Sequence, residues 1–284
     1  MKTAQTITMS RRTAAIAASL SALALGSTLM IGCTNPMAIQ YYNSAVEKYN
    51  KGDFQGAIAD YSKAIEINPQ DADFYASRGN VKHELKNYQE AISDYNNALK
   101  IDPKSATTYY NRGLAKHDLE DRQGAIADYT RAIEINPQDP DIYENRGNVK
   151  YELKDYQGAI SDYNKALKID PKSPIAYYNR GNANSRLKDY KRAISDYSKT
   201  LENDPNNESA YYNRGVSEYR LRDYQRAISD FTKAIEINPE NVSYYVNRGV
   251  AKEMTGDLDG ACADWKEASF RGDKDSSGWV DDQC

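Results

Sequence analysis

Six prolines recur at a constant interval of 34 residues, and this interval constrains the fold more than any other feature of the chain. They are Pro69, Pro103, Pro137, Pro171, Pro205 and Pro239. A strict period in this range is typical of solenoids, in which each repeat forms one supersecondary unit and stacks on its neighbours. Counted back from the prolines, the period divides the chain into seven units: 38–71, 72–105, 106–139, 140–173, 174–207, 208–241 and 242–275.

Small and aromatic residues recur at fixed places within these units. Numbered from the start of a unit, position 4 is always Tyr, position 20 is always Ala, and position 8 is Gly in six units. Position 24 is always aromatic, and position 27 is Ala in six units. Small residues let two helices approach closely, and aromatic residues fill the space beside the contact. The proline then ends the second helix, because it disfavours helix in the residue before it. The pattern predicts two packed helices in every unit.

This pattern resembles the tetratricopeptide repeat (TPR), over residues 38–275. The resemblance implies an all-α fold, a right-handed superhelical solenoid of seven helix–turn–helix units. A solenoid needs a cap on its open end. The segment 276–284 offers Trp279 and Val280 as apolar contacts, so we expect it to form a short C-terminal capping helix.

The first 32 residues are expected to be a signal peptide. A basic start is followed by an uncharged, mostly apolar stretch over residues 13–32, which is typical of a secretory signal. Leu29 to Cys33 resembles a bacterial lipobox, which implies cleavage before Cys33 and a lipid on that residue. Residues 33–37 would then be a linker. Plain secretion and an uncleaved membrane anchor are the alternatives.

The lipobox resemblance also predicts a location and a pairing of the cysteines. A lipidated Cys33 would hold the protein on a membrane of the bacterial cell envelope, facing the periplasm, with the outer membrane favoured over the inner one. Cys262 and Cys284 then remain, 22 residues apart, as a pair that can form a disulfide in an oxidising compartment. Two unpaired thiols are the alternative.

Two charged positions depart from or add to the usual TPR pattern. Position 7, ordinarily Leu, is Arg in six units and Ser44 in the first, and position 23 is Asp in all seven. We expect each aspartate to meet the arginine of the following unit, Asp60 with Arg78 and Asp94 with Arg112, in a ladder of partly buried ion pairs that fixes register. Ser44 would lack a partner because no unit precedes it. A phosphate or nucleic-acid site is disfavoured, because every arginine has an acid at hand and the net charge is −4.

A row of asparagines marks the candidate binding site. In the TPR family the first helix of each repeat lines the concave groove, and position 6 of this helix is Asn in six units. An asparagine ladder at this position is similar to that of protein O-linked N-acetylglucosamine transferases, where the amides hold an extended peptide backbone. An amide both donates and accepts, as a peptide bond does, and Tyr adds contact area with a polar tip. The alternative is that the amides bond within or between repeats. The predicted groove residues are Asn43, Tyr110, Asn111, Asn145, Asn148, Tyr178, Asn179, Asn182, Tyr212, Asn213 and Asn247.

No enzyme or cofactor is predicted. The sequence lacks a phosphate-binding glycine loop, an HExxH motif and a nucleophile elbow. His83 and His117 share one groove position but have no third nitrogen or sulfur ligand, so we predict no metal site. Asp73, Asp141 and Glu144 stand where a chaperone-type carboxylate clamp needs basic groups. The sequence therefore predicts a non-catalytic scaffold that binds a peptide segment or helix of an envelope or membrane-complex protein. A homodimerising assembly factor without a peptide groove is the alternative.

Overall fold

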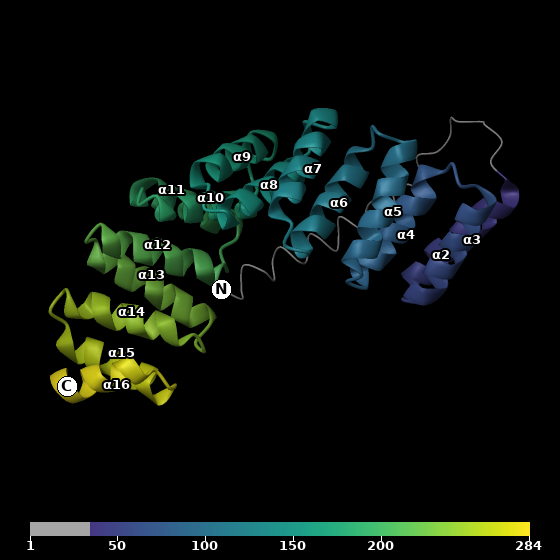
Figure 1. The fold of residues 1–284 in the computed structure, drawn as a ribbon. Helices are drawn as coiled ribbons and strands as arrows, with labels where there is room; N and C mark the ends of the chain where they lie inside the picture. The colour runs from purple at the N-terminus through teal and green to yellow at the C-terminus, as the bar shows by residue number, and fades with distance from the viewer. Residues whose placement is uncertain (1–34) are drawn as a thin grey trace. The chain divides into compact units, whose positions relative to one another are not determined.

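The computed structural model describes residues 35–284, and every regular element in that range is a helix (Figure 1). The predicted signal peptide and the lipidation site at Cys33 lie outside the described residues. Within residues 35–284, no helix has both the length and the apolar character needed to cross a membrane. Two compact units divide the chain between Val149 and Lys150, inside one helix.

The first unit consists of consecutive antiparallel helix pairs that stack in chain order (Figure 1). Its helices are α2 (Pro36–Asn50), α3 (Phe54–Ile67), α4 (Ala72–Glu84), α5 (Tyr88–Ile101), α6 (Ala106–Asp118), α7 (Arg122–Ile135) and most of α8 (Pro140–Glu152). Each helix packs on the one before and the one after it, so the core is a continuous layer between neighbouring pairs rather than a single centre.

The second unit repeats the same arrangement and ends with a single helix. Its helices are α9 (Tyr156–Ile169), α10 (Pro174–Arg186), α11 (Tyr190–Asn203), α12 (Glu208–Arg220), α13 (Tyr224–Ile237), α14 (Val242–Glu253), α15 (Leu258–Phe270) and α16 (Lys274–Gln283). The last helix packs on α15, in the position expected of a cap, and begins two residues before the segment 276–284. The fold is therefore the all-α TPR solenoid that the repeat pattern predicts.

The turn inside each helix pair follows one local design. In six repeats an aspartate at position 16 caps the second helix, as Asp155 does by accepting from the backbone N–H of Gly158 at 2.9 Å. In the second repeat the residue is Asn87, whose side chain makes no such bond. The residue before position 16 has a positive φ, which is Gly52 in the first repeat but Lys154, with φ 65°, in the fourth. Non-glycine residues rarely adopt this conformation, and here the surrounding turn hydrogen bonds hold it.

Close contact inside each pair depends on the glycine at position 8 and the aromatic ring at position 24. A Cβ atom built on Gly113 would lie 2.7 Å from Cε1 of Tyr129. That ring is fully buried, as are Ala125 and Ala132 on the same helix. The small residues therefore allow the close helix approach that the sequence pattern predicts.

Candidate functional site

Five of the six arginines at position 7 form a two-pronged pair with the aspartate of their own repeat. Arg78 on α4 donates from Nη2 to Asp94 Oδ1 at 2.7 Å and from Nε to Asp94 Oδ2 at 2.9 Å. Equivalent two-pronged pairs join Arg112 to Asp128, Arg180 to Asp196, Arg214 to Asp230 and Arg248 to Asp264. The expected pairing of Asp60 with Arg78 and of Asp94 with Arg112 is wrong. Position 7 of the first helix faces position 23 of its own partner helix, so the ion pair closes within the repeat.

The same arginine also links its repeat to the preceding one, through its remaining terminal nitrogen. Arg112 Nη1 donates to Asn96 Oδ1 at 2.6 Å, and Arg78 Nη1 donates to Ser62 Oγ at 2.9 Å. The Arg112 guanidinium also lies over the Tyr109 ring, with its Cζ atom 5.3 Å from the ring centroid. The arginine row therefore does fix register between repeats, but through a hydroxyl or amide of the previous repeat.

In the first repeat a serine replaces the arginine at position 7, and other donors bond to the buried aspartate. Ser44 donates its hydroxyl to Asp60 Oδ2 at 2.6 Å, and Lys48 donates to the same oxygen at 2.6 Å. Burial works to raise the pKa of Asp60, but the hydrogen bonds from Lys48 and Ser44 hold it below its usual value. In this repeat a short hydroxyl at position 7 and the lysine at position 11 together supply the donors for the buried aspartate.

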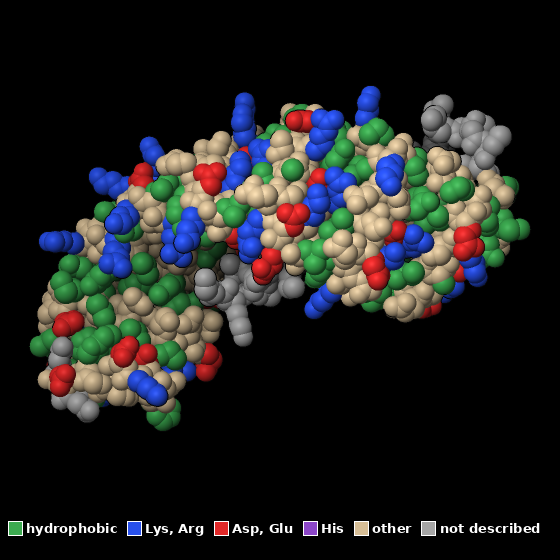
Figure 2. All heavy atoms as spheres, in the orientation of Figure 1, with side chains coloured by type: hydrophobic (Ala, Val, Ile, Leu, Met, Phe, Trp, Pro, Cys, Tyr) green, Lys and Arg blue, Asp and Glu red, His purple; other side chains and the backbone are tan. Residues whose placement is uncertain are grey.

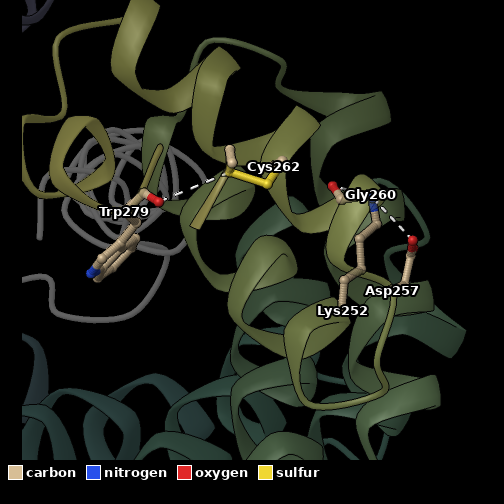
Figure 3. The surroundings of a disulfide bond; sticks show 6 residues. Lys252, Asp257, Gly260, Cys262 and Trp279 are labelled. Atoms are coloured by element: carbon tan, nitrogen blue, oxygen red, sulfur yellow. Dashed lines mark hydrogen bonds between the residues drawn. A yellow bond between two sulfur atoms is a disulfide. The ribbon is translucent and has the colours of Figure 1, made fainter. Parts of the chain in front are cut away.

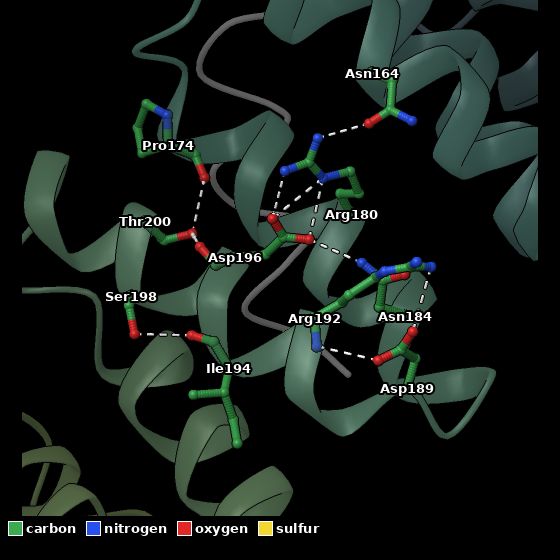
Figure 4. A network of polar contacts seen from close by, with 10 residues as sticks. All are labelled: Asn164, Pro174, Arg180, Asn184, Asp189, Arg192, Ile194, Asp196, Ser198 and Thr200. Atoms are coloured by element: carbon green, nitrogen blue, oxygen red, sulfur yellow. Dashed lines mark hydrogen bonds and ion pairs between the residues drawn. The ribbon is translucent and has the colours of Figure 1, made fainter.

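A lysine at position 11 completes this cluster in five repeats, and two repeats depart from the rule. In the second repeat Lys82 Nζ lies 2.7 Å from Asp94 Oδ2, and Lys48, Lys116, Lys150 and Lys252 make the equivalent contact. In the fifth repeat Asn184 takes this place and donates to Asp196 Oδ2 at 2.9 Å (Figure 4). In the sixth repeat the residue is Glu218.

Glu218 places a second carboxyl beside a buried aspartate. Both Glu218 and Asp230 are 5% exposed, and Glu218 Oε2 is buried with no hydrogen-bond partner in the structure. Burial, together with the charge of Asp230, raises the pKa of Glu218 to about 8. A protonated Glu218 can donate to Asp230, which an ionised one cannot. The sequence analysis did not single out Glu218. The signal was available, because five other repeats have Lys at position 11 and an acidic residue there reverses the charge.

In the first unit, the predicted groove asparagines use their amide N–H groups on neighbouring repeats. Asn111 Nδ2 donates to Asn80 Oδ1 at 2.9 Å, and Asn145 Nδ2 donates to the Tyr110 hydroxyl at 3.0 Å. Asn111 and Asn145 are buried. Asn43, in the first repeat, is exposed.

In the second unit the same bonds recur with more of each side chain open to solvent. Asn213 Nδ2 lies 3.0 Å from the Tyr178 hydroxyl and 3.1 Å from Asn182 Oδ1. Asn247 Nδ2 donates to the Tyr212 hydroxyl at 3.2 Å. These side chains are half-buried, and burial raises the pKa of Tyr178, so its hydroxyl stays protonated.

The asparagine row thus acts first as a set of bonds between repeats. The Nδ2 groups bond to neighbouring repeats, which is the alternative to peptide binding given in the sequence analysis. Peptide binding by this row stays a prediction. Asn148 and Asn179, which complete the predicted set, are half-buried and make polar contacts of their own. Among the hydrogen bonds of residues 35–284, none has the amide oxygen of the half-buried Asn213 as its acceptor, so the acceptor side of this amide is what remains for a partner.

The end of the first helix makes a further contact between repeats. His83 Nε2 lies 2.9 Å from Asp118 Oδ2, and the equivalent place in the second unit holds a bond from Arg186 Nε to the Tyr151 hydroxyl at 3.1 Å. His83 is therefore engaged with the next repeat. Among residues 35–284, no three His, Cys, Asp or Glu side chains gather in a way that could hold a metal ion.

The cap is joined to the last repeat by a disulfide (Figure 3). Cys262 on α15 and Cys284 at the chain end are bonded, with their Cα atoms 5.7 Å apart. Trp279 on α16 packs on Trp265, with ring centroids 5.4 Å apart, and Trp265 is almost fully buried as a result. The cap thus covers the aromatic residue at position 24 of the last repeat.

The stacked helix pairs and the polar row along their first helices define a helical-repeat scaffold for protein binding. A family model described as "TPR repeat" matches residues 46–86, 79–120, 116–154 and 147–188, and one described as "Tetratricopeptide repeat" matches residues 174–207 and 209–241. The chain belongs to the tetratricopeptide-repeat family. Members with this fold are generally non-catalytic interaction scaffolds, and no enzyme family matches.

Solved structures with the same fold include several TPR proteins. The C-terminal part of a TPR repeat-containing protein from Cytophaga hutchinsonii is 21% identical with a TM-score of 0.71, covering 84% of this chain and 98% of that one. YrrB, described as a TPR protein with an unusual peptide-binding site, is 25% identical with a TM-score of 0.59, covering 65% and 95%. MamA is 25% identical with a TM-score of 0.58, covering 62% and 96%. None of the curated proteins matches the chain.

Proposed function

We propose that this protein is a membrane-anchored adaptor that binds a peptide segment or helix of another envelope protein along the first helices of its repeats. The carrying observation is the asparagine row, whose Nδ2 groups are bonded to the preceding repeat while amide oxygens such as Asn213 Oδ1 accept nothing. An extended peptide has backbone N–H groups that must be satisfied, and a row of fixed acceptors can receive them. YrrB, with its peptide-binding site, supports the same use of a TPR surface.

The tyrosines beside the row would supply contact area. Tyr212 is half-buried, lies 5.0 Å from Tyr244 between ring centroids, and accepts from Asn247. A side chain held by such contacts loses little rotamer freedom when a partner binds, which favours affinity. The bonds between repeats would thus fix the groove before the peptide arrives.

The anchor and the location belong to the same proposal. The lipobox-like segment before Cys33 supports a lipid on this residue, which would hold the first repeat close to the surface of a bacterial envelope membrane, facing the periplasm, with the outer membrane favoured. Labelling with a fatty-acid analogue tests this step. A Cys33→Ser variant should lose the label, and a label that persists on the variant would refute lipidation at this residue.

Capture from detergent-solubilised membranes tests the groove. Asn43→Arg places a long charged side chain at an exposed groove position that makes no bond between repeats, so the fold should tolerate it. Gln89→Arg makes the same change at an exposed position on a second helix, α5, and serves as the control. We expect partners to be lost with Asn43→Arg and retained with Gln89→Arg. Equal retention by both would contradict groove binding in the first repeat.

Self-association is the alternative use of the same repeats. Sizing the protein over a range of concentrations separates the two. A dimer that Asn43→Arg leaves intact, together with no captured partner, would favour the assembly-factor interpretation. A monomer at every concentration would remove it.

A further inference from the structure

Two consecutive turns of the second unit form an exposed basic edge. They are residues 186–192, between α10 and α11, and residues 220–226, between α12 and α13, and we call them together the basic turn edge. The first contains four Lys or Arg and one Asp, the second three Arg and one Asp. All seven cationic residues are exposed. In Figure 2, Lys and Arg side chains gather over the α9–α12 part of this unit.

The two acidic residues of this edge are used by the fold. Asp189 accepts from the backbone N–H of Arg192 at 3.1 Å, and Asp223 accepts from that of Arg226 at 3.4 Å, so each caps the helix that follows. Their carboxylates lie 3.4 Å from the guanidinium groups of Arg192 and Arg226, whose side chains are 79% and 75% exposed. Even with both carboxylates counted, the edge keeps a net charge of five.

Each turn also presents an exposed leucine among the cations. Leu187 is 38% exposed and Leu221 is 42% exposed, each directly before a basic residue with positive φ, Lys188 at 63° and Arg222 at 65°. The two turns have the same backbone design, and their helices pack in consecutive pairs. Both leucines therefore lie at turn tips, and Leu187 also borders a cavity.

The turn geometry does not require this charge. The equivalent turn in the first unit, residues 118–124, contains three acidic residues and one basic residue. Glu120 there adopts the same φ of 63° that Lys188 adopts in the second unit. Because an acidic residue fills the same backbone position, the clustering of cations in the second unit is not explained by folding.

A cavity of about 480 Å³ opens beside the first of the two turns. It is lined by Leu187 and Arg192 from the edge and by Asn184 and Arg180 deeper in the fold. Asn184 stands where five other repeats have the longer Lys. Arg180 Nη1 and Nη2 each keep one N–H beyond the bonds to Asn164 and Asp196. Asp189 and Asp196, which pair with these arginines, also line the cavity, so it offers an anionic group the N–H groups that these pairs leave over.

We propose that the basic turn edge binds the surface of a bilayer that contains anionic phospholipid. Exposed apolar tips surrounded by cations fit a surface into which the leucines can insert while the cations meet phosphate groups. An acidic polypeptide would satisfy the cations but offers no layer for leucines at turn tips. The cavity beside Leu187 would accept a lipid phosphate. This proposal concerns residues remote in sequence from Cys33 and stands whether or not a lipid is attached there.

Co-sedimentation with vesicles tests it on the full chain. The probes are vesicles of phosphatidylcholine alone and with roughly one third phosphatidylglycerol. The four-site variant K188Q/R192Q/R222Q/R226Q removes cations from the edge, and residues 1–34 are unchanged, so any binding through them contributes equally. Each cation near an anionic surface changes partitioning about fivefold. We expect the wild type to prefer the anionic vesicles and the four-site variant to lose at least ~100-fold in partitioning.

A matched control removes the same charge elsewhere in the unit. The variant K165Q/K168Q/K199Q/K233Q neutralises four exposed lysines on second helices and should reduce binding much less. The pair L187S/L221S should reduce binding about tenfold, since it removes the inserted apolar groups. Circular dichroism should show equal helix content in every variant.

Three results would overturn the proposal. The first is equal binding of the wild type to both kinds of vesicle, and the second is equal loss in the four-site variant and in its control. The third is binding to soluble polyglutamate that requires the edge cations while anionic vesicles do not bind. That third result would assign the edge to an acidic polypeptide instead.

Discussion

The carboxyl of Glu218 makes the stability of the sixth repeat depend on pH, and replacing it with Gln should remove this dependence. Glu218 lies on α12, where five other repeats have a lysine that contacts the aspartate at position 23. The charged groups that act on it are Asp230 from α13, Arg214 from its own helix and Asp223 from the turn. On the other side of α12, α11 presents the uncharged Ser198, which is bonded to Arg214. The cluster therefore has three carboxyls, counting Glu218 itself, and one guanidinium.

The magnitude follows from the pKa of Glu218, which rises from 4.5 to about 8 on folding. Below pH ~4.5 the carboxyl is protonated in both the folded and the unfolded chain, so it does not lower the free energy of unfolding. Between these values the unfolded chain releases the proton and the folded chain keeps it, so stability falls as pH rises. Above pH ~8 the loss is complete and amounts to on the order of 5 kcal/mol, at 1.36 kcal/mol for each pH unit.

Glu218→Gln keeps the shape of the side chain and cannot ionise. We expect the variant to match the wild type near pH ~5 and to exceed it by about 5 kcal/mol near pH ~9. The assay is urea unfolding followed by circular dichroism at both pH values. Hydrogen exchange of α12 and α13 should accompany it, because repeat arrays can open locally. The difference between the two proteins cancels the pH dependence of every other group.

A second variant guards against an unrelated effect of the substitution. Glu218→Lys introduces the lysine that five other repeats have at this position. Its stability should likewise not fall as the pH rises through ~8. If the wild type and Glu218→Gln show the same change in stability between pH ~5 and pH ~9, the buried-proton argument is refuted.

Three further predictions concern the fold, and each is measured by urea unfolding or hydrogen exchange. Arg112→Ala should destabilise by about 1 to 3 kcal/mol because the buried Asp128 loses both hydrogen bonds from Arg112 and keeps only the ion pair with Lys116; an unchanged midpoint would contradict it. Gly113→Ala should cost about 1 to 3 kcal/mol through its clash with the Tyr129 ring, and an unchanged midpoint would show that the ring moves aside at no cost. Cys284→Ser should lower the stability of α16 by about 3 kcal/mol without changing the protection of the other helices, so a loss spread over the whole array would be the wrong outcome.

The fold could be predicted from the sequence because the features that determine it are local and repeated. The glycine at position 8, such as Gly113, recurs in six repeats, and the ring at position 24, such as Tyr129, recurs in all seven. Proline ends the second helix of the first six repeats. The glycine and the ring that contact each other lie within one repeat, so the repeat pattern is enough to place them against each other. The pattern of small and aromatic residues was therefore sufficient to predict how neighbouring helices pack.

The pairing of the charges could not be obtained from the period. Every repeat contains one Asp at position 23, and all but the first contain an Arg at position 7, so pairing within repeats and between repeats are equally periodic. Both schemes leave one aspartate without an arginine, Asp60 in the first case and Asp264 in the second. The distinguishing signal was Lys48 together with Ser44, because a repeat without arginine still needs donors for its own Asp60.

The asparagine row shows why residue type alone does not assign a binding role. An amide has a donor side and an acceptor side, and the sequence cannot say which of them the fold consumes. In the structure Asn213 donates to Tyr178 and Asn182 of the preceding repeat, so only its oxygen is left for a partner. A groove built this way receives N–H donors in register with the repeats but cannot donate to peptide carbonyls from the same amides. Its preference should therefore be for segments whose backbone N–H groups are free, which an extended peptide has and the interior of a helix does not.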